Sequence, residues 1–522
     1  MIRNKQISAV DNTRIAKNTM LLYVRMIVFM AIGFYTSRII LNALGVEDYG
    51  INNVVSGVVS MFTFVNGALT TATSRHITFA LGAEDKFKLK DVFGTSLTIH
   101  GIMSLVVILL AETIGLWIFY NKMVIPEDRI YAAMWVYQIS ILSAVLNIMS
   151  VPYNATIIAH EKMSAFAWIT IFDAVMKLAI VFLLVEIPLD KLIIYALLFF
   201  AINLSDQMIY MFYCQRNFYE SRTFFIWNKL LIKEMSSFAG WSLYGNLSVA
   251  CLTQGENILL NMFFGPVVNA ARGIAIQTQA IVQRFIDNFQ MALNPQITKA
   301  YASNEIQAMQ NLMFRSSRFS FCLLLLLSLP VMFEANYILT VWLKLVPNDT
   351  VLFFRIIMCT SLFYATVNPV IRVIQATGKV KFYELVCGTI NLMLLPIAYI
   401  MLTYGCPAYF VLIVHFILDV ITQCIRLIIL RRLINMSVLI AFRKVYVPVL
   451  SVLFVSLILP LIVHYQLTEG FVRFISVCVV SVISVSLASF YIGFQLNERL
   501  FVIGKFKSRV NSIIHMNKIN IF

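Results

Sequence analysis

The stretch IILNALG (residues 39–45) recurs about 219 residues further along the chain as ILLNMFFG (residues 258–265). A second pair, PYNATIIAHEK (residues 152–162) and PVIRVIQATGK (residues 369–379), matches at an offset of about 217. Asp206 and Asp419 match at an offset of about 213. The order of the matches is kept while their spacing drifts, which indicates two copies of one unit. Internal repeats in apolar segments are typical of transport proteins whose halves surround a central site.

The composition excludes a soluble globule. Of 522 residues, 60% are hydrophobic and only 12% are charged, and the mean hydropathy is +0.84. Apolar runs of about 20 residues, long enough to span ~30 Å of hydrocarbon, recur throughout. They are continuously apolar instead of alternating, which favours helices over a barrel. We therefore predict an all-α membrane protein with fourteen transmembrane helices, near residues 21–42, 51–74, 93–119, 130–152, 165–186, 192–213, 237–262, 267–293, 316–335, 350–374, 383–404, 407–430, 447–465 and 471–494.

The repeat also predicts the domain organisation. We expect two six-helix bundles related by a pseudo-two-fold repeat, a cytoplasmic linker between them, and two extra C-terminal helices followed by a basic cytoplasmic tail. The predicted boundaries are 1–217, 218–236, 237–433 and 434–522.

Lysine and arginine fix the predicted orientation. If both termini are cytoplasmic, four basic residues lie on the opposite side: Lys122, Arg129, Lys191 and Lys344. This asymmetry follows the positive-inside rule, and it explains most of the +15 net charge without a nucleic-acid partner. The eight cysteines form no C-x-x-C pair, so we interpret them as apolar packing residues.

Two predicted helices carry a polar face. On residues 267–293 and just beyond, polar side chains recur at a period of about 3.6: Arg272, Gln279, Gln283, Asp287, Gln290 and Asn294. Residues 51–74 do the same with Asn52, Ser56, Ser60, Thr63, Asn66, Thr70 and Ser74. Polar groups facing lipid cost free energy, so each stripe faces protein or a hydrated cavity. Helix–helix contact explains the Ser/Thr stripe equally well; the arginine and amides of the other stripe favour a cavity. Asn257 adds to a similar face on residues 237–262.

Arg38, Glu256 and Arg272 lie about five to seven residues from the predicted outer ends of their helices, which is about 8–10 Å deep. Arginine binds phosphate bidentately and stays charged when desolvated, so this level suits an anionic headgroup. Glu256 is a candidate for ion coupling, exchanging its arginine partner for H⁺ or Na⁺, and Asp287 is a second candidate. A static salt bridge at Glu256 is an equal alternative.

Other charges within the predicted spans have simpler explanations. Asp173 and Lys177 are one helical turn apart and can neutralise each other. Arg25, Arg372 and Arg426 lie near cytoplasmic ends, where long side chains reach the interface.

Enzyme and cofactor signals are weak. The sequence contains no nucleotide-binding loop, no HExxH, no GxSxG and no clustered metal ligands, and its six histidines are scattered. We expect no enzyme activity, no cofactor and no metal. An acidic pair, Glu47–Asp48, could serve a polyprenyl-sugar glycosyltransferase or polymerase, but this chain lacks the sizeable outer loops of such enzymes. A turn before Gly50 explains the pair adequately.

Two stretches carry a resemblance to a known family. NTMLLYVRMIVFMAIGFYTSRIILNALGVEDYGINNVVSGVVSMF (residues 18–62) and NAARGIAIQTQAIVQRFIDNFQMALNPQITKAYA (residues 269–302) resemble bacterial polysaccharide-biosynthesis (O-antigen-type) flippases of the multidrug/oligosaccharidyl-lipid/polysaccharide (MOP) superfamily. The resemblance implies a multi-pass, MATE-like inner-membrane protein with a central cavity. It also implies alternating-access transport of polyprenyl-pyrophosphate-linked oligosaccharides to the outer leaflet, for surface polysaccharide or lipopolysaccharide assembly. The arginines that members often carry on their first and eighth helices match Arg38 and Arg272 by position.

On this interpretation the pyrophosphate engages arginines and the sugar follows the polar faces. The predicted contacts are Arg38, Arg272, Arg284, Gln279, Gln283, Gln290, Asn52, Thr63, Asn66 and Asn257. Expected partners are the lipid-linked oligosaccharide, membrane lipids, a coupling cation, and glycan polymerases or glycosyltransferases. The first alternative is a cation-coupled multidrug exporter of the same superfamily, for which an acidic cavity is expected.

Overall fold

The computed structural model describes residues 12–62, 66–123, 125–186, 188–343, 346–496, 498–500 and 503, and it gives only the backbone at some helical positions, Arg38 among them. These residues form helices and connecting turns, with no strand among them, so the predicted all-α class is confirmed. Eleven helical segments within this part of the chain are long and apolar enough to cross a membrane. The remaining three predicted spans, 51–74, 237–262 and 267–293, are those with the most polar faces. The protein is therefore a multi-pass membrane protein.

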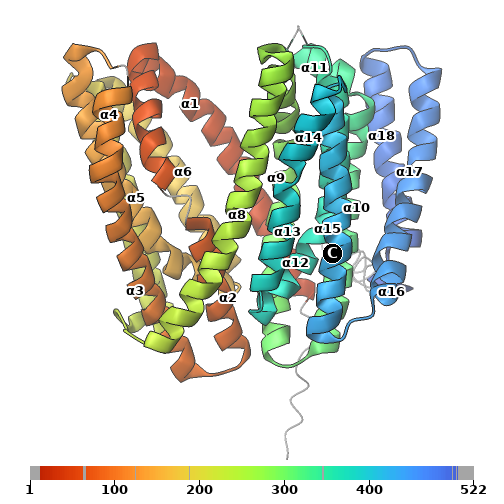
Figure 1. Ribbon diagram of the computed structural model, residues 1–522, viewed down its shortest axis with the longest axis horizontal. Coiled ribbons are helices and arrows are strands. Elements are labelled where there is room, and N and C mark those ends of the chain that lie inside the picture. The colour runs from red at the N-terminus through yellow and green to blue at the C-terminus, as the bar shows by residue number, and fades with distance from the viewer. Residues whose placement is uncertain are drawn as a thin grey trace, which may run out of the picture. The chain divides into compact units, whose positions relative to one another are not determined.

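The helices follow one another along the chain with short connections (Figure 1). In the first half they are α1 (Asn12–Phe62), α2 (Asn66–Gly82), α3 (Lys86–Leu110), α4 (Leu116–Lys122), α5 (Ile130–Ala159), α6 (Met163–Glu186) and α7 (Lys191–Asn217). In the second half they are α8 (Lys229–Phe264), α9 (Pro266–Ala302), α10 (Ile306–Phe333), α11 (Ala335–Leu343), α12 (Thr350–Thr377), α13 (Lys381–Leu392), α14 (Leu394–Thr403) and α15 (Tyr409–Ile434). The last are α16 (Val438–Ala441), α17 (Val447–Gln466) and α18 (Phe471–Ala488).

The sequence repeat has a counterpart in the backbone. Gly45 interrupts α1 with φ 79°, and Gly265 separates α8 from α9 with φ 77°. This left-handed conformation is readily adopted by glycine and rarely by other residues. The second matched pair behaves alike, because the turn after α5 places Glu161 at φ 58° and the turn after α12 places Gly378 at φ 76°. The two copies thus share their breaks as well as their spans.

By internal contacts the described chain divides into two compact units. Unit 1 comprises Met1–Ala250, Met291–Met309 and Arg372–Thr389, and unit 2 comprises Cys251–Gln290, Gln310–Ile371 and Ile390–Phe522. The boundaries expected from the repeat, at residues 217, 236 and 433, remain a prediction.

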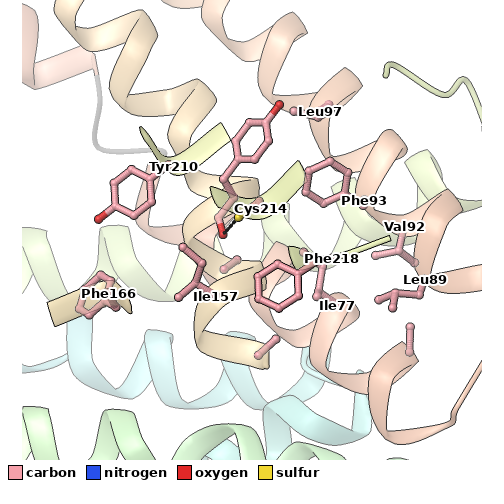
Figure 2. Packing of buried hydrophobic residues seen from close by; sticks show 14 of the residues in the cluster. Ile77, Leu89, Val92, Phe93, Leu97, Ile157, Phe166, Tyr210, Cys214 and Phe218 are labelled. Carbon is pink, nitrogen blue, oxygen red and sulfur yellow. Dashed lines mark hydrogen bonds between the residues drawn. The ribbon is translucent and has the colours of Figure 1, made fainter. Parts of the chain in front are cut away.

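Two apolar clusters form the interior of unit 1, and α5 contributes to both. One centres on Phe93, Ile157 and Cys214, whose side chains converge from α3, α5 and α7 in Figure 2. The other surrounds Tyr137 and Leu192. Lipid is as apolar as these side chains, so close packing and buried hydrogen bonds hold such bundles together more than exclusion of water does. The hydroxyl of Tyr137, which donates to the carbonyl of Ala111 over 2.6 Å, is one such bond.

A buried carboxylate joins distant segments of unit 1 at the turn after α5. Glu161, with a side chain only 5% exposed, lies 2.7 Å from Lys299 Nζ and 3.3 Å from Arg14 Nε. Gln296 also donates to it over 3.3 Å. Its repeat counterpart is Gly378, and here Arg75 donates to the carbonyl of the neighbouring Ala376 over 3.3 Å. In both copies, therefore, the turn is held by polar side chains from a stripe-bearing helix, α9 or α2.

The C-terminal segment that contains α17 and α18 is attached in unit 2 to α10 at two levels. Glu334, which follows α10 and is fully buried, accepts from His464 over 2.8 Å and from Arg473 over 3.0 Å. Near the middle of α10, buried Arg318 donates to Glu498 over 2.7 Å and to the carbonyl of Lys444 over 2.9 Å. Because α17 and α18 have no counterpart in the repeat, their attachment to α10 depends on ion pairs that the repeated units do not share.

Replacing Glu334 by alanine is expected to lower the free energy of unfolding by about 3–5 kcal/mol, because Arg473 would be left buried without its main counter-ion. Glu469 provides a matched control. It lies 3.9 Å from the same arginine and is 47% exposed, so Glu469→Ala should cost less than about 1 kcal/mol. Denaturant titration in detergent micelles measures both. Equal losses would show that the buried pair does not fasten α17 and α18.

Candidate functional site

A cluster of charged side chains is buried within unit 2. Glu256 of α8, 1% exposed, accepts hydrogen bonds from Arg272 of α9 and, over 2.7 Å, from His415 Nδ1 of α15. Arg272, 3% exposed, also donates to the side-chain carbonyl of Asn257. The other ring nitrogen of His415 lies 3.7 Å from Asp419. These five residues are called the Glu256 cluster below.

Local sequence explains why α8 and α9 meet here. Gly265 alone separates the two helices, and its positive φ reverses the chain. Glu256 lies about two turns before Gly265 and Arg272 about two turns after it, so the antiparallel helices bring both side chains to one level. The acid and the base can therefore pair directly.

The electrostatics of the Glu256 cluster are balanced. Two carboxylates, Glu256 and Asp419, face two guanidinium groups, those of Arg272 and the buried Arg426, with His415 between. Burying charges costs free energy unless each is paired and hydrogen-bonded, and both carboxylate oxygens of Glu256 are engaged. Arg272 Nε, by contrast, is buried with no hydrogen-bond partner. Arg272 can thus donate a further hydrogen bond, to an additional negatively charged group.

This cluster agrees only partly with the sequence-based expectations. Arg272 and Glu256, expected at one level, are in direct contact, whereas the side chain of Arg38 lies outside the described residues. The histidines are scattered in the sequence and were not predicted to belong to the site, yet His415 binds Glu256. Its place in the site could have been suspected because His415 lies one helical turn before Asp419 in an otherwise apolar helix. Arg426, expected to extend towards the interface, is only 3% exposed instead, and its charge interacts with that of Asp419.

The polar face of α9 continues from the cluster as a chain of hydrogen bonds. Gln279 donates to Ser361 of α12 over 2.7 Å and to Gln283 over 3.4 Å. Gln283 in turn donates to Asp287 over 3.1 Å. Arg284 and Asp287 are exposed. This middle part of the stripe therefore presents amide and charged groups that are only partly covered.

Gln290 differs from the rest of the stripe. Its side chain, 3% exposed, donates to Ser320 of α10 over 3.1 Å and to the carbonyl of Ala365 of α12 over 3.3 Å. Its carbonyl accepts from Asn368 over 2.5 Å. With both ends of its amide occupied, Gln290 joins three helices, as the helix-contact alternative supposes. Its predicted role in substrate binding stays a prediction.

The polar face predicted for residues 51–74 borders a cavity of about 500 Å³ in unit 1. Asn52, Ser56 and Asn66 line it, whereas Thr63 lies outside the described residues. The opposite wall comes from α5 and α7 and was not predicted. The described residues that line it are Asn52, Ser56, Val59, Asn66, Ile139, Ser140, Ser143, Ala144, Asn147, Tyr195, Ala196 and Phe199. It is called the unit 1 cavity below.

The acidic pair considered for an enzyme lies in a helix, not in the expected turn. Asp48 accepts two hydrogen bonds from Arg129, over 2.6 Å and 2.9 Å, and Arg129 also donates to Asp190 over 2.7 Å. Burial tends to raise the pKa of Asp190, but hydrogen bonds from Arg129 and from two backbone N–H groups outweigh it and lower the pKa. In the described part of the chain, no group of three His, Cys, Asp or Glu residues could hold a metal ion. Asp48 thus serves an ion-pair network.

The fold is similar to that of solved MATE transporter structures. Three solved structures illustrate the likeness, beginning with a MATE in the bent conformation (TM-score 0.70, 14% identity, 81% of this chain and 95% of that one). The outward-facing conformation of a multidrug resistance MATE family transporter has a TM-score of 0.68, at 14% identity over 80% and 96%. A MOP superfamily transporter from Pyrococcus furiosus, whose reverse binding-pocket polarity suggests a different function, has a TM-score of 0.62, at 13% identity over 80% and 96%.

No protein-family model and no curated protein matches the sequence. At identities this low, the structural likeness establishes the shared fold, and the cargo has to be argued from the residues of this chain.

Proposed function

We propose that this protein flips a polyprenyl-pyrophosphate-linked oligosaccharide from the cytoplasmic to the outer leaflet of a bacterial inner membrane, with both termini cytoplasmic. The observation that carries the proposal is Arg272, a buried arginine held by one carboxylate and one amide and retaining a spare N–H donor. A pyrophosphate is the kind of group that such a fork binds bidentately. The partly covered amides of α9 lie along the same helix, where hydroxyl groups of a glycan can bond to them.

The contacts of Arg272 suggest how cargo and ion are exchanged. When a phosphate oxygen replaces Glu256 at the guanidinium, the carboxylate is left buried without its main counter-ion. Such a charge is costly, so Glu256 takes up a proton. His415 is hydrogen-bonded to the same carboxylate and is the nearest group able to pass that proton. Cargo binding and proton binding are thereby coupled through one arginine.

This geometry favours a proton over sodium as the coupling ion. Hard cations bind through several oxygen ligands. Both oxygens of Glu256 already accept from N–H donors, so a sodium ion has no open carboxylate oxygen at Glu256 unless Arg272 or His415 first withdraws. A proton binds to a single carboxylate oxygen, so the release of Arg272 alone is enough for Glu256 to take one up.

Deleting the gene and analysing the lipid-linked glycans of the cell tests the function. We expect a polyprenyl-pyrophosphate-linked oligosaccharide to accumulate on the cytoplasmic side and surface polysaccharide to be lost, with both restored by the intact gene. Sensitivity to ethidium and tetraphenylphosphonium should not change. Normal surface polysaccharide together with increased sensitivity to those cations would overturn the proposal in favour of a drug exporter.

A further inference from the structure

The unit 1 cavity is a built pocket that the Arg272 mechanism does not use. Its volume of about 500 Å³ lies in the range of small-molecule sites. Four helices form its wall: α1, α2, α5 and α7. The described lining residues all belong to unit 1, so this wall of the pocket is formed within one compact unit.

The lining has a specific chemical character. Among the described residues that line it, no side chain carries a charge, and the polar groups are the amides of Asn52, Asn66 and Asn147 and the hydroxyls of three serines and Tyr195. The side-chain oxygen of Asn66 is buried with no hydrogen-bond partner. A buried acceptor left unpaired is costly, so this oxygen is suited to a ligand hydroxyl. The pocket therefore offers hydrogen bonds without selecting for charge.

An aromatic wall completes the pocket. Tyr195 and Phe199 lie one turn apart on α7, with ring centroids 6.0 Å apart. The ammonium group of Lys177, which is paired with Asp173, lies 5.0 Å from the centroid of the Phe199 ring. Tyr195 has no such cation beside its ring among the contacts of the described residues, and it adds a phenolic hydroxyl. It is therefore the better placed of the two to pack against a flat ligand and bond its edge.

We propose that the unit 1 cavity binds the neutral sugar rings of the cargo. A sugar ring presents hydroxyl groups around its edge and C–H groups on its faces, which match the amides, hydroxyls and aromatic wall. A phosphate would call for arginine or lysine in the lining, and a lipophilic cation for a carboxylate. The inference rests on the proposed function and adds to it: Arg272 binds the phosphates, the α9 amides bind glycan hydroxyls, and the unit 1 cavity holds sugar rings.

Saturation-transfer-difference NMR on the full-length protein in nanodiscs tests the pocket. The probes are N-acetylglucosamine, galactose and rhamnose, with tetraphenylphosphonium as the rival ligand. Ala144→Phe fills the cavity, Tyr195→Ala removes the ring, and Tyr195→Phe retains it. Ala201→Phe, at an exposed position on the same helix as Tyr195, is the matched control. Melting temperatures confirm that each variant is folded.

We expect at least one of the sugars to receive saturation in the wild type, in Ala201→Phe and in Tyr195→Phe. The signal should fall at least fivefold in Ala144→Phe and in Tyr195→Ala. Three results would overturn the inference: no sugar signal in the wild type, an undiminished signal in Ala144→Phe, or tetraphenylphosphonium as the ligand that the filling variant excludes.

The same variants separate this inference from the proposed function. If the wild type flips lipid-linked glycan and Ala144→Phe flips it at the wild-type rate, the sugar pocket is wrong and the flippase stands. Sugar binding in the cavity without any flipping by the wild type would instead reject the flippase and leave the pocket in place.

Discussion

Glycan export should fall at least a hundredfold when Arg272 is replaced by alanine, although the protein still inserts in the membrane. The variant loses the only guanidinium that holds both Glu256 and Asn257 within the described cluster. An arginine that binds pyrophosphate through two N–H groups contributes several kcal/mol, and each 1.4 kcal/mol is a factor of about ten. Surface polysaccharide and accumulated lipid-linked glycan measure the loss. Export above a tenth of the wild-type level would contradict it.

Stability complicates this variant, and a second substitution resolves the problem. Arg272→Ala alone leaves Glu256 buried beside His415 only, which should cost about 3–5 kcal/mol of unfolding free energy. In Arg272→Ala/Glu256→Gln both charges are absent, and a neutral amide can still accept from His415. We expect this double variant to recover most of the stability. The double variant lacks the proposed phosphate ligand and the proposed proton carrier. Export at the wild-type level would therefore show that Arg272 and Glu256 form only a structural salt bridge, whereas loss of export in a stable double variant would show that the pair serves transport.

Glu161→Ala should lower the unfolding free energy by about 2–3 kcal/mol. Glu161 accepts from Lys299 over 2.7 Å and from Gln296 over 3.3 Å, and it pairs with Arg14. Hydrogen bonds to charged groups contribute about 1.5–3 kcal/mol, and the freed cations are partly exposed and can be hydrated. The end of α9 should then detach more readily. Thermal unfolding and the rate of trypsin cleavage after Lys299 measure the change.

Glu84 provides a matched control for the backbone. It also adopts a left-handed conformation, with φ 55° against 58° for Glu161, but its side chain is exposed. Replacing either glutamate by alanine changes the local conformational preference alike, so the difference between the variants reports the side-chain contacts. Glu84→Ala is expected to shift stability by less than about 0.5 kcal/mol. If the two variants have the same unfolding free energy and the same cleavage rate, the side-chain contacts of Glu161 do not stabilise the end of α9.

The sequence predicted the architecture well because its signals are local. Span length and hydropathy identify helices directly, and the glycines closing the repeated stretches, Gly45 and Gly265, adopt the same backbone conformation. The three most polar predicted spans fall in α1 and α2, in α8 and in α9, but they are not among the eleven described segments that are apolar enough to cross a membrane. The sequence analysis assigned the acidic pair Glu47–Asp48 to a turn. In the structure α1 resumes after the break at Gly45, and both residues lie in its helical continuation.

The site was less predictable because its contacts join residues far apart in the chain. His415 and Glu256 are separated by 159 positions, and a lone histidine in an apolar helix gives no sign of its partner. The serines of α5 and Tyr195 of α7 look like ordinary packing residues until the cavity brings them opposite Asn52. Gln290 fits the stripe by spacing alone, yet it is buried among three helices, because periodicity fixes a face and not what covers it.

The most direct test of the central claim, that Arg272 binds the pyrophosphate of the cargo, is a flipping assay in vesicles. The double variant Arg272→Ala/Glu256→Gln is reconstituted with lipid-linked glycans extracted from the deletion strain, and the rate at which they become accessible on the opposite leaflet is compared with the wild type. We predict a folded protein whose flipping rate does not exceed that of protein-free vesicles. Flipping at the wild-type rate would show that Arg272 only neutralises Glu256 and that the cargo binds elsewhere.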